Sequence, residues 1–357
     1  MHAMSDSALS RNSLIGMDPV QLKAAVVAAG GKAFAGKQLA EWLYEKRVSD
    51  FDEMTNLAKD LRAQLASRFQ LLTSAVVARE ESGEGTTKLG IRLQDGLIIE
   101  AVLMRESDRL TACISTQAGC AMGCRFCASG QLGLRRHLTA GEILEQFFHL
   151  AAVVRQESPD GWLTNVVVMG MGEPLHNFDG LMGALTILNA DWGFRFGARR
   201  VTVSTVGLPD HIRQLAEQGY QFNLAISLHA TSDEQRTALI PTNVASGLRK
   251  ILEAARYYFE TTNREVTFEY TLVGEANDTG DDAHRLAALL YGFPRANVNL
   301  IPMNPVKDSG LKEPTDESVD QFAAILQDAG VNVHVRRKRG RRVQAACGQL
   351  RLRLEAK

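Results

Sequence analysis

Strand-like and helix-like segments alternate through most of the chain, and this alternation constrains the possible fold more than any other feature of the sequence. The expected strands span residues 112–116, 165–171, 200–206, 223–229, 266–273 and 298–302, followed by a later one at 331–336. The expected helices span residues 139–156, 178–189, 209–218, 247–261, 279–291 and 317–329. Successive βα units build parallel sheets with right-handed connections. The chain is therefore predicted to have an α/β fold, either an open doubly wound sheet or a full or partial barrel.

Two shorter regions precede the series of βα units. Apolar residues recur at helical spacing within 37–44 and 57–69, which predicts a small helical domain. Residues 88–93 and 97–104 flank Asp95-Gly96 in the pattern of a β-hairpin. The expected organisation is a disordered tail at 1–15, a helical domain at 16–75, a hairpin extension at 76–105, an α/β domain at 106–345 and a C-terminal segment at 346–357.

Composition narrows the class of protein. Lys and Arg number 40 against 41 Asp and Glu, so a strongly polybasic chain is excluded, although a local basic face can still bind nucleic acid. Hydrophobic residues make up 45%, which is enough for a large core. Neither an apolar run of about 20 residues nor a secretory signal is present, so we expect a cytoplasmic protein without a membrane segment.

Three of the five cysteines lie close together in Cys120-Ala-Met-Gly-Cys124-Arg-Phe-Cys127, directly after the first strand of the βα series. Their odd number and clustering disfavour a disulfide framework and favour metal or redox chemistry in a reducing compartment. An iron–sulfur cubane normally takes four cysteines, so three local ones would leave one iron open to a ligand. The alternative is a structural zinc site, whose fourth ligand would be Cys113, Cys347 or a histidine.

Small and polar residues gather where the expected strands end, which is where α/β proteins build their sites. They are Gly172, Glu173, Ser204, Ser227, His229 and Asn304. A glycine lets the backbone approach a ligand, a carboxylate can accept from an ammonium group, and neutral polar side chains suit a carboxylate, ribose or adenine. Each residue alone could be a loop cap, a turn or a structural histidine, whereas together they predict a small-molecule site.

At the cysteine motif the chain resembles the radical SAM superfamily. That resemblance implies a partial (βα)6 barrel, a [4Fe-4S] cluster and S-adenosylmethionine bound at the open iron. It narrows to the RlmN/Cfr group of RNA methyltransferases over about residues 16–350, on motifs spread along the chain. These are Lys37-Gln-Leu-Ala-Glu-Trp, Phe51-Asp-Glu-Met-Thr-Asn-Leu, Met169-Gly-Met-Gly-Glu173-Pro174, Ser227-Leu-His229, Ile301-Pro-Met-Asn304-Pro and Ala345-Ala-Cys347-Gly348.

The resemblance assigns roles to individual residues. Cys120, Cys124 and Cys127 would hold the cluster. S-adenosylmethionine, two molecules per turnover, would contact Gly172, Glu173, Ser204, Ser227, Leu228, His229 and Asn304. The product would be 2-methyladenine at position 2503 of 23S rRNA and, in some members, at position 37 of tRNA.

Three further residues would carry the reaction through a protein–RNA adduct. Carbon 2 of adenine cannot attack a sulfonium methyl as an ordinary nucleophile, whereas a thiolate can. By resemblance, Cys347 carries the methyl group, Glu100 accepts the proton of carbon 2, and Cys113 releases the adduct by forming a disulfide with Cys347. We expect these two cysteines to approach within about 7 Å between Cα atoms. Read without the family, Glu100 is most simply an exposed residue of the hairpin, and Cys113 a small buried one.

Basic residues indicate where RNA could bind. Residues 336–342 hold six arginines and lysines just before Cys347, and further basic residues stand elsewhere. They are Lys32, Lys37, Lys46, Arg47, Arg135, Arg136, Arg199 and Arg200. We expect 23S rRNA, and tRNA in some cases, as partners, with an electron donor such as flavodoxin and a monomeric enzyme. The alternatives are a Cfr-like enzyme that methylates carbon 8 and a non-catalytic iron–sulfur RNA-binding protein.

Overall fold

The computed structural model describes residues 12–304, 306, 309–336 and 350. Its helices are α1 (Pro19–Ala28), α2 (Ala35–Ala40), α3 (Lys59–Arg68), α4 (Ala128–Gln131), α5 (Ala140–Glu157), α6 (Phe178–Asn189), α7 (Pro209–Ala216), α8 (Asp233–Leu239), α9 (Leu248–Thr262), α10 (Gly280–Leu290) and α11 (Asp316–Asp328). Short helical turns are η1 (Glu41–Lys46), η2 (Phe51–Glu53), η3 (Pro174–Asn177), η4 (Ala198–Arg200) and η5 (Pro241–Ala245).

Ten strands of this described part form one curved sheet in the order β14-β13-β12-β11-β10-β9-β6-β5-β4-β3. They are β3 (Ala75–Ser82), β4 (Thr86–Arg92), β5 (Ile98–Glu106), β6 (Arg109–Cys113), β9 (Asn165–Val168), β10 (Val201–Thr205), β11 (Asn223–Ser227), β12 (Val266–Leu272), β13 (Asn297–Pro302) and β14 (Asn332–Val335). Two small pairs complete the structure, β1 (Asn12–Ser13) with β2 (Phe69–Gln70) and β7 (Gln117–Gly119) with β8 (Leu134–His137).

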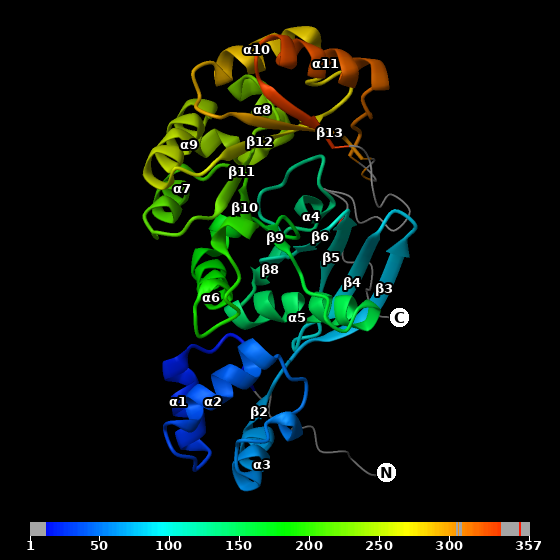
Figure 1. The fold of residues 1–357 in the computed structure, drawn as a ribbon. Helices are drawn as coiled ribbons and strands as arrows, with labels where there is room; N and C mark the ends of the chain where they lie inside the picture. The colour runs from blue at the N-terminus through cyan, green and yellow to red at the C-terminus, as the bar shows by residue number, and fades with distance from the viewer. Residues whose placement is uncertain (1–11, 305, 307–308, 337–349, 351–357) are drawn as a thin grey trace.

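The strands from β6 to β14 pair in parallel, and helices connect them on the outside of the curve. Figure 1 shows α7, α9, α10 and α11 covering this outer surface. Strands β14 and β3 are the two ends of the sheet and do not pair with each other, so the barrel is open. The expected α/β fold with a partial barrel is confirmed, and the doubly wound alternative is not adopted.

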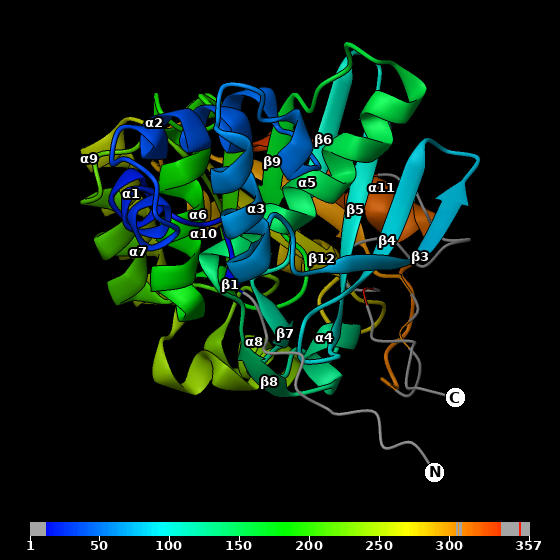
Figure 2. The ribbon, with the colours of Figure 1, turned by 90° about the horizontal axis from the view of Figure 1, so that it is seen from below.

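The expected hairpin is confirmed as β4 and β5, with Asp95 accepting a hydrogen bond from the Leu97 N–H at 3.1 Å and Gly96 at a φ of 87° in the turn. A further antiparallel strand, β3, was not predicted. This strand lies at the sheet edge and has polar residues on both faces, so it lacks the alternating pattern of a half-buried strand. Because β5 also pairs with β6, the extension is part of the barrel sheet, as the view from below in Figure 2 shows.

The two faces of the sheet differ in chemistry. The face turned toward the helices is apolar and fully buried, with side chains such as Leu89, Val166, Leu224 and Phe268. Register places Cys113, Ser204, Ser227, Glu269 and Thr271 together on the opposite face, because directly paired residues point to the same side of a sheet. The outer face therefore supplies the core, and the inner face carries polar groups into the barrel.

The N-terminal helices pack firmly against the barrel. Tyr44 is fully buried, its ring centroid lies 5.4 Å from that of Phe194, and its hydroxyl donates to the Met17 carbonyl at 2.7 Å. The Arg47 guanidinium stacks 3.6 Å from the ring centroid of Trp162. Arg47 was one of the basic residues expected at an RNA-binding surface, and the structure shows that this cation joins the small domain to the barrel. Among the described residues, none of the helices combines the length and the hydropathy that a membrane-spanning segment needs.

Candidate active site

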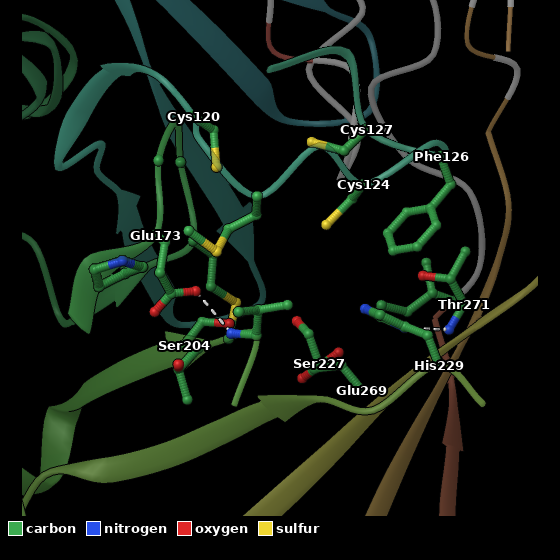
Figure 3. A pocket seen from close by; sticks show the side chains of 18 of the residues that line it. Cys120, Cys124, Phe126, Cys127, Glu173, Ser204, Ser227, His229, Glu269 and Thr271 are labelled. Carbon is green, nitrogen blue, oxygen red and sulfur yellow. Dashed lines mark hydrogen bonds between the residues drawn. The ribbon is translucent and has the colours of Figure 1, made fainter. Parts of the chain in front are cut away.

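The cysteine motif forms a tight loop beyond the first barrel strand. Strand β7 pairs with β8 on either side of it, and the Cys120 N–H donates to the Gly133 carbonyl at 3.1 Å. Gly119 has a φ of 82°, and a Cβ there would lie 1.9 Å from the Gly133 oxygen, so only glycine fits. In Figure 3 the sulfur atoms of Cys120, Cys124 and Cys127 are directed toward one cavity.

The cavity has a volume of about 160 Å³ and lies at the C-terminal ends of the strands. The sequence-predicted residues that line it are Cys120, Cys124, Cys127, Gly172, Glu173, Ser204, Ser227, His229 and Asn304. No three His, Cys, Asp or Glu side chains in the described part of the chain are placed to hold a single metal ion. A cubane has a different requirement, since each thiolate binds its own corner of the cluster.

Burial controls the protonation of the cysteines. Removal from water raises the pKa of the Cys120 thiol to about 12, and burial also raises the pKa of Cys124. Neutral thiols are therefore favoured in the bare protein, and cationic iron would supply the charge that makes them thiolates. Three soft donors converging on one cavity fit a [4Fe-4S] cluster with a corner left for another ligand.

The loop after β9 forms a second wall of the cavity. Gly172 has a φ of 102°, and a Cβ there would lie 2.5 Å from the Gln117 Cβ. The buried Glu173 carboxylate accepts from the Val206 N–H at 2.7 Å and the Leu175 N–H at 3.1 Å. Burial raises the pKa of Glu173 to about 7. The hydrogen bonds from Val206, Thr205 and Leu175 act in the opposite direction and limit this rise. An ammonium group bound here would restore the charged form.

Strand β11 ends at Ser227, and His229 follows with a φ of 58°. The His229 Nδ1 accepts from the Thr271 N–H at 2.9 Å, so the other ring nitrogen carries the proton, and Figure 3 shows it turned toward the cavity. Burial, followed by the nearby Arg236, lowers the pKa of His229 to about 3. His229 is thus a neutral hydrogen-bond donor. Leu228 is buried in the core and does not line the cavity.

Sequence reasoning missed several cavity residues. Phe126 packs edge-on against His229, with centroids 4.7 Å apart. Glu269 lies on the inner face beside Ser227, and its Oε1 accepts from the Asn299 side chain at 2.8 Å. Its Oε2 is 3.8 Å from an Arg336 nitrogen and accepts no hydrogen bond from the described residues. Burial raises the pKa of Glu269. The available signal was a charged residue in an otherwise uncharged strand.

Arg236 was also missed, because helix α8 was not predicted. Its guanidinium is 1% exposed and donates to the carbonyls of Leu228 and Ser227 at 3.0 Å each and to the Val206 carbonyl. It also donates to the Asn243 side chain at 2.6 Å. Arg236 therefore fixes the ends of β10 and β11, which carry the cavity residues. The signal for α8 was Ser232 three residues before Gln235, a typical helix start.

Glu100 and Cys113 lie in the barrel wall and do not line the cavity itself. Both are buried, so the expectation of an exposed Glu100 is wrong. Register places Cys113 opposite Val102, two residues along β5 from Glu100, and the side chains of Glu100 and Cys113 project from the same inner face. Ser115 ties this wall to the loop after β9, because its hydroxyl donates to the Glu100 carbonyl and accepts from the Met171 N–H, both at 2.7 Å.

The expected methyl carrier Cys347 and residues 337–342 lie outside the described residues, and so does the expected approach of Cys347 to Cys113. Among the described basic residues, Arg136 forms ion pairs with Asp95 at 2.6 Å and Glu142 at 2.7 Å, so its charge is used within the fold. Arg135, Arg199 and Arg200 are exposed.

Three cysteines in a loop after the first strand of an open parallel barrel define the radical SAM class. Comparison with known proteins agrees, since the Radical SAM superfamily model matches residues 114–290. A second family model, the ribosomal RNA large subunit methyltransferase N-terminal domain, matches residues 12–71.

Relatives cover nearly the whole chain. The probable dual-specificity RNA methyltransferase RlmN of Geobacillus thermodenitrificans is 46% identical over 93% of this chain and 90% of its own length. Its namesake from Rhodopirellula baltica is 44% identical over 96% and 91%. A crystal structure of a radical SAM methyltransferase from Sphaerobacter thermophilus superposes with a TM-score of 0.91 at 42% identity, covering 95% of this chain and 99% of the other. The chain belongs to the RlmN family of radical SAM RNA methyltransferases.

Proposed function

We propose that this chain methylates carbon 2 of adenine 2503 in 23S rRNA and that adenine 37 of tRNA is a second substrate. The supporting observation is the inner face of the barrel, which presents Glu100 and Cys113 alongside the strand-end residues of the cavity. An RNA-binding iron–sulfur protein without catalysis would need neither of these two buried residues. The dual-specificity names of the relatives support the same pair of substrates.

The residues of the chain divide into three tasks. Cys120, Cys124 and Cys127 hold the cluster. The lining residues from Gly172 to Asn304 bind and orient S-adenosylmethionine, two molecules of which supply in turn a methyl group and a radical. The buried His229 donates a hydrogen bond into the cavity. Because its ring is neutral, it does not repel the positive charge of the sulfonium.

The remaining task is methyl transfer to RNA. Cys347 carries the methyl group as a thioether and joins it to carbon 2 of the adenine. Glu100 accepts the carbon 2 proton. The Cys113 thiolate then attacks the Cys347 sulfur, so that a sulfur–sulfur bond forms while the bond from the Cys347 sulfur to the methylene carbon breaks, and that carbon takes up a proton to become the methyl group of the product. The target base must leave its stack to reach a buried cavity. We propose that residues 16–75 and the basic segment at 336–342 contact the RNA, and that the enzyme is a cytoplasmic monomer reduced by a flavodoxin-like donor.

The experiment is an anaerobic reaction of reconstituted enzyme with a 23S rRNA fragment, followed by mass spectrometry of the nucleosides. We expect 2-methyladenosine and 5′-deoxyadenosine. Product methylated at carbon 8 would favour a Cfr-like activity, although the match of residues 12–71 to the ribosomal RNA methyltransferase N-terminal domain supports carbon 2. The control is Cys124→Ala, which should lack the cluster and form neither product. Wild-type enzyme that binds iron but never forms 5′-deoxyadenosine would leave the non-catalytic alternative.

A further inference from the structure

A buried ion pair lies inside the barrel wall. The Lys88 Nζ on β4 is 3.0 Å from the Glu100 Oε1 on β5, and the two side chains are only 3% and 7% exposed. A second carboxylate, Glu80 on β3, reaches to 3.6 Å from the same Nζ and is 39% exposed. Lysine is almost never buried to this extent unless it is paired.

The strand register places this pair beside the reacting thiol. Lys88 is directly opposite Val102, and Val102 is directly opposite Cys113. Directly opposed residues share a face, so the ammonium group and the thiol project from the same side of the sheet. Glu100 is two residues from Val102 and projects from that side too. Among the described residues, the register puts four charged or titratable groups on this face near Glu100: Lys88, Glu80, Cys113 and the exposed Arg92, which is directly opposite Ile98.

Stability does not explain the pair. Burying two charges costs about as much as their attraction returns, and a well-packed apolar pair in the same place would stabilise a fold at least as well. Apart from Glu80 and the exposed Arg92, the nearby residues on this face are uncharged, including Val102, Met104 and Thr86. A requirement of the reaction explains the pairing of Lys88 with Glu100 better than a gain in stability does.

The requirement comes from proton transfer. A carboxyl group buried in a protein favours its neutral form, which cannot act as a base. A cation at hydrogen-bond distance favours the ionised form, and it also fixes which way the carboxylate points. Lys88 is the cation in that position.

We propose that Lys88 is a positioning residue for the methylation reaction, which holds Glu100 ionised and oriented to accept the carbon 2 proton. The inference rests on the role proposed for Glu100. The carbon–hydrogen bond breaks, its electron pair stays with the adenine adduct, and the proton forms an oxygen–hydrogen bond on Glu100. Lys88 exchanges no proton, and Glu80 compensates its charge once Glu100 is neutral.

The test compares Lys88→Met, Lys88→Arg and the control Lys312→Met in the reconstituted full-length enzyme. Lys312 forms an ion pair with Glu275 at 2.7 Å, and both side chains are more than 60% exposed. The assay measures 2-methyladenosine in a 23S rRNA fragment across pH 6–9, and mass spectrometry measures methylation of Cys347. Methylation of Cys347 does not use the base, so it reports whether cofactor binding and folding are intact.

For Lys88→Met we expect methylated Cys347, a protein–RNA adduct that accumulates, and a slower release of product at neutral pH. The lower limb of the pH–rate profile should move up by about one unit or more, which is about tenfold in rate on that limb. Lys88→Arg should retain most of the activity, and Lys312→Met all of it. In the background of Glu100→Gln, the Lys88→Met change should have little further effect.

Two results would overturn the inference. One is a Lys88→Met enzyme whose rate and pH profile match the wild type. The other is a Lys88→Met change that lowers the rate by the same factor in the Glu100→Gln background as in the wild type, because Lys88 would then act independently of Glu100. This comparison also applies if Lys88→Met folds poorly, which a lower level of Cys347 methylation would reveal. Wild-type enzyme that forms no 2-methyladenosine would instead refute the proposed function, and with it the role of Lys88.

Discussion

Replacing Arg236 by methionine should destabilise the barrel around the cavity. The guanidinium donates hydrogen bonds to the Leu228, Ser227 and Val206 carbonyls and to the Asn243 side chain. Leaving a buried acceptor without a partner costs about 1–3 kcal/mol. Four acceptors lose a donor, but relaxation and water will satisfy some of them. The expected loss in unfolding free energy is therefore about 3–5 kcal/mol, in the range for breaking a buried charged network.

Urea unfolding followed by circular dichroism measures this effect in the wild type, in Arg236→Met and in the control Arg249→Met. Arg249 also pairs with a carboxylate, Glu253 at 2.6 Å, but its side chain is 77% exposed. Exposed ion pairs contribute little to the free energy of unfolding, so the control should unfold at the same urea concentration as the wild type. Equal unfolding of Arg236→Met and Arg249→Met would refute the argument that Arg236 holds the strand ends. If Arg236→Met is as stable as the wild type but binds S-adenosylmethionine more weakly, Arg236 shapes the cavity without stabilising the fold.

Three further outcomes can be checked on the same protein. Gly172→Ala should abolish binding of S-adenosylmethionine in a calorimetric titration, because its Cβ would lie 2.5 Å from that of Gln117; retained affinity would contradict the close approach. Arg47→Ala should weaken docking of the helical domain by about 1–2 kcal/mol through loss of its stack on Trp162, and limited proteolysis between the domains should accelerate. Burial raises the pKa of Glu173 from 4.5 to about 7, so the folded protein binds more protons than the unfolded chain and stability falls as pH rises through this window. The loss of about 3 kcal/mol should be absent in Glu173→Gln, measured without S-adenosylmethionine; an identical pH dependence in both would exclude the effect.

Much of the fold could be predicted from local pattern. The helices α5, α6 and α9 and the strands β10 to β13 lie within a few residues of the expected ranges, because apolar periodicity and caps are encoded within each segment. The cavity residues at strand ends could be predicted because parallel strands finish at a common edge.

Other features depend on contacts between distant segments and left no local signal. The ion pair of Lys88 with Glu100 joins two strands whose partners are set only by the sheet register. Likewise, nothing near Arg47 in the sequence indicates a stack on Trp162, more than a hundred positions away. The faces of β5 could not be assigned from sequence, since Ile98 to Leu103 are apolar on both sides of Glu100.

The docking of the helical domain on the barrel has a consequence for substrate selection. Tyr44 packs on Phe194 and Arg47 stacks on Trp162, so the exposed Phe34 and Lys37 are held at a set separation from the cluster loop. A ligand that touches both places must match that separation. If RNA contacts the helical domain as proposed, a short oligonucleotide around the target adenine would lack that contact. A folded RNA of matching dimensions would make both contacts and bind more tightly through the second one.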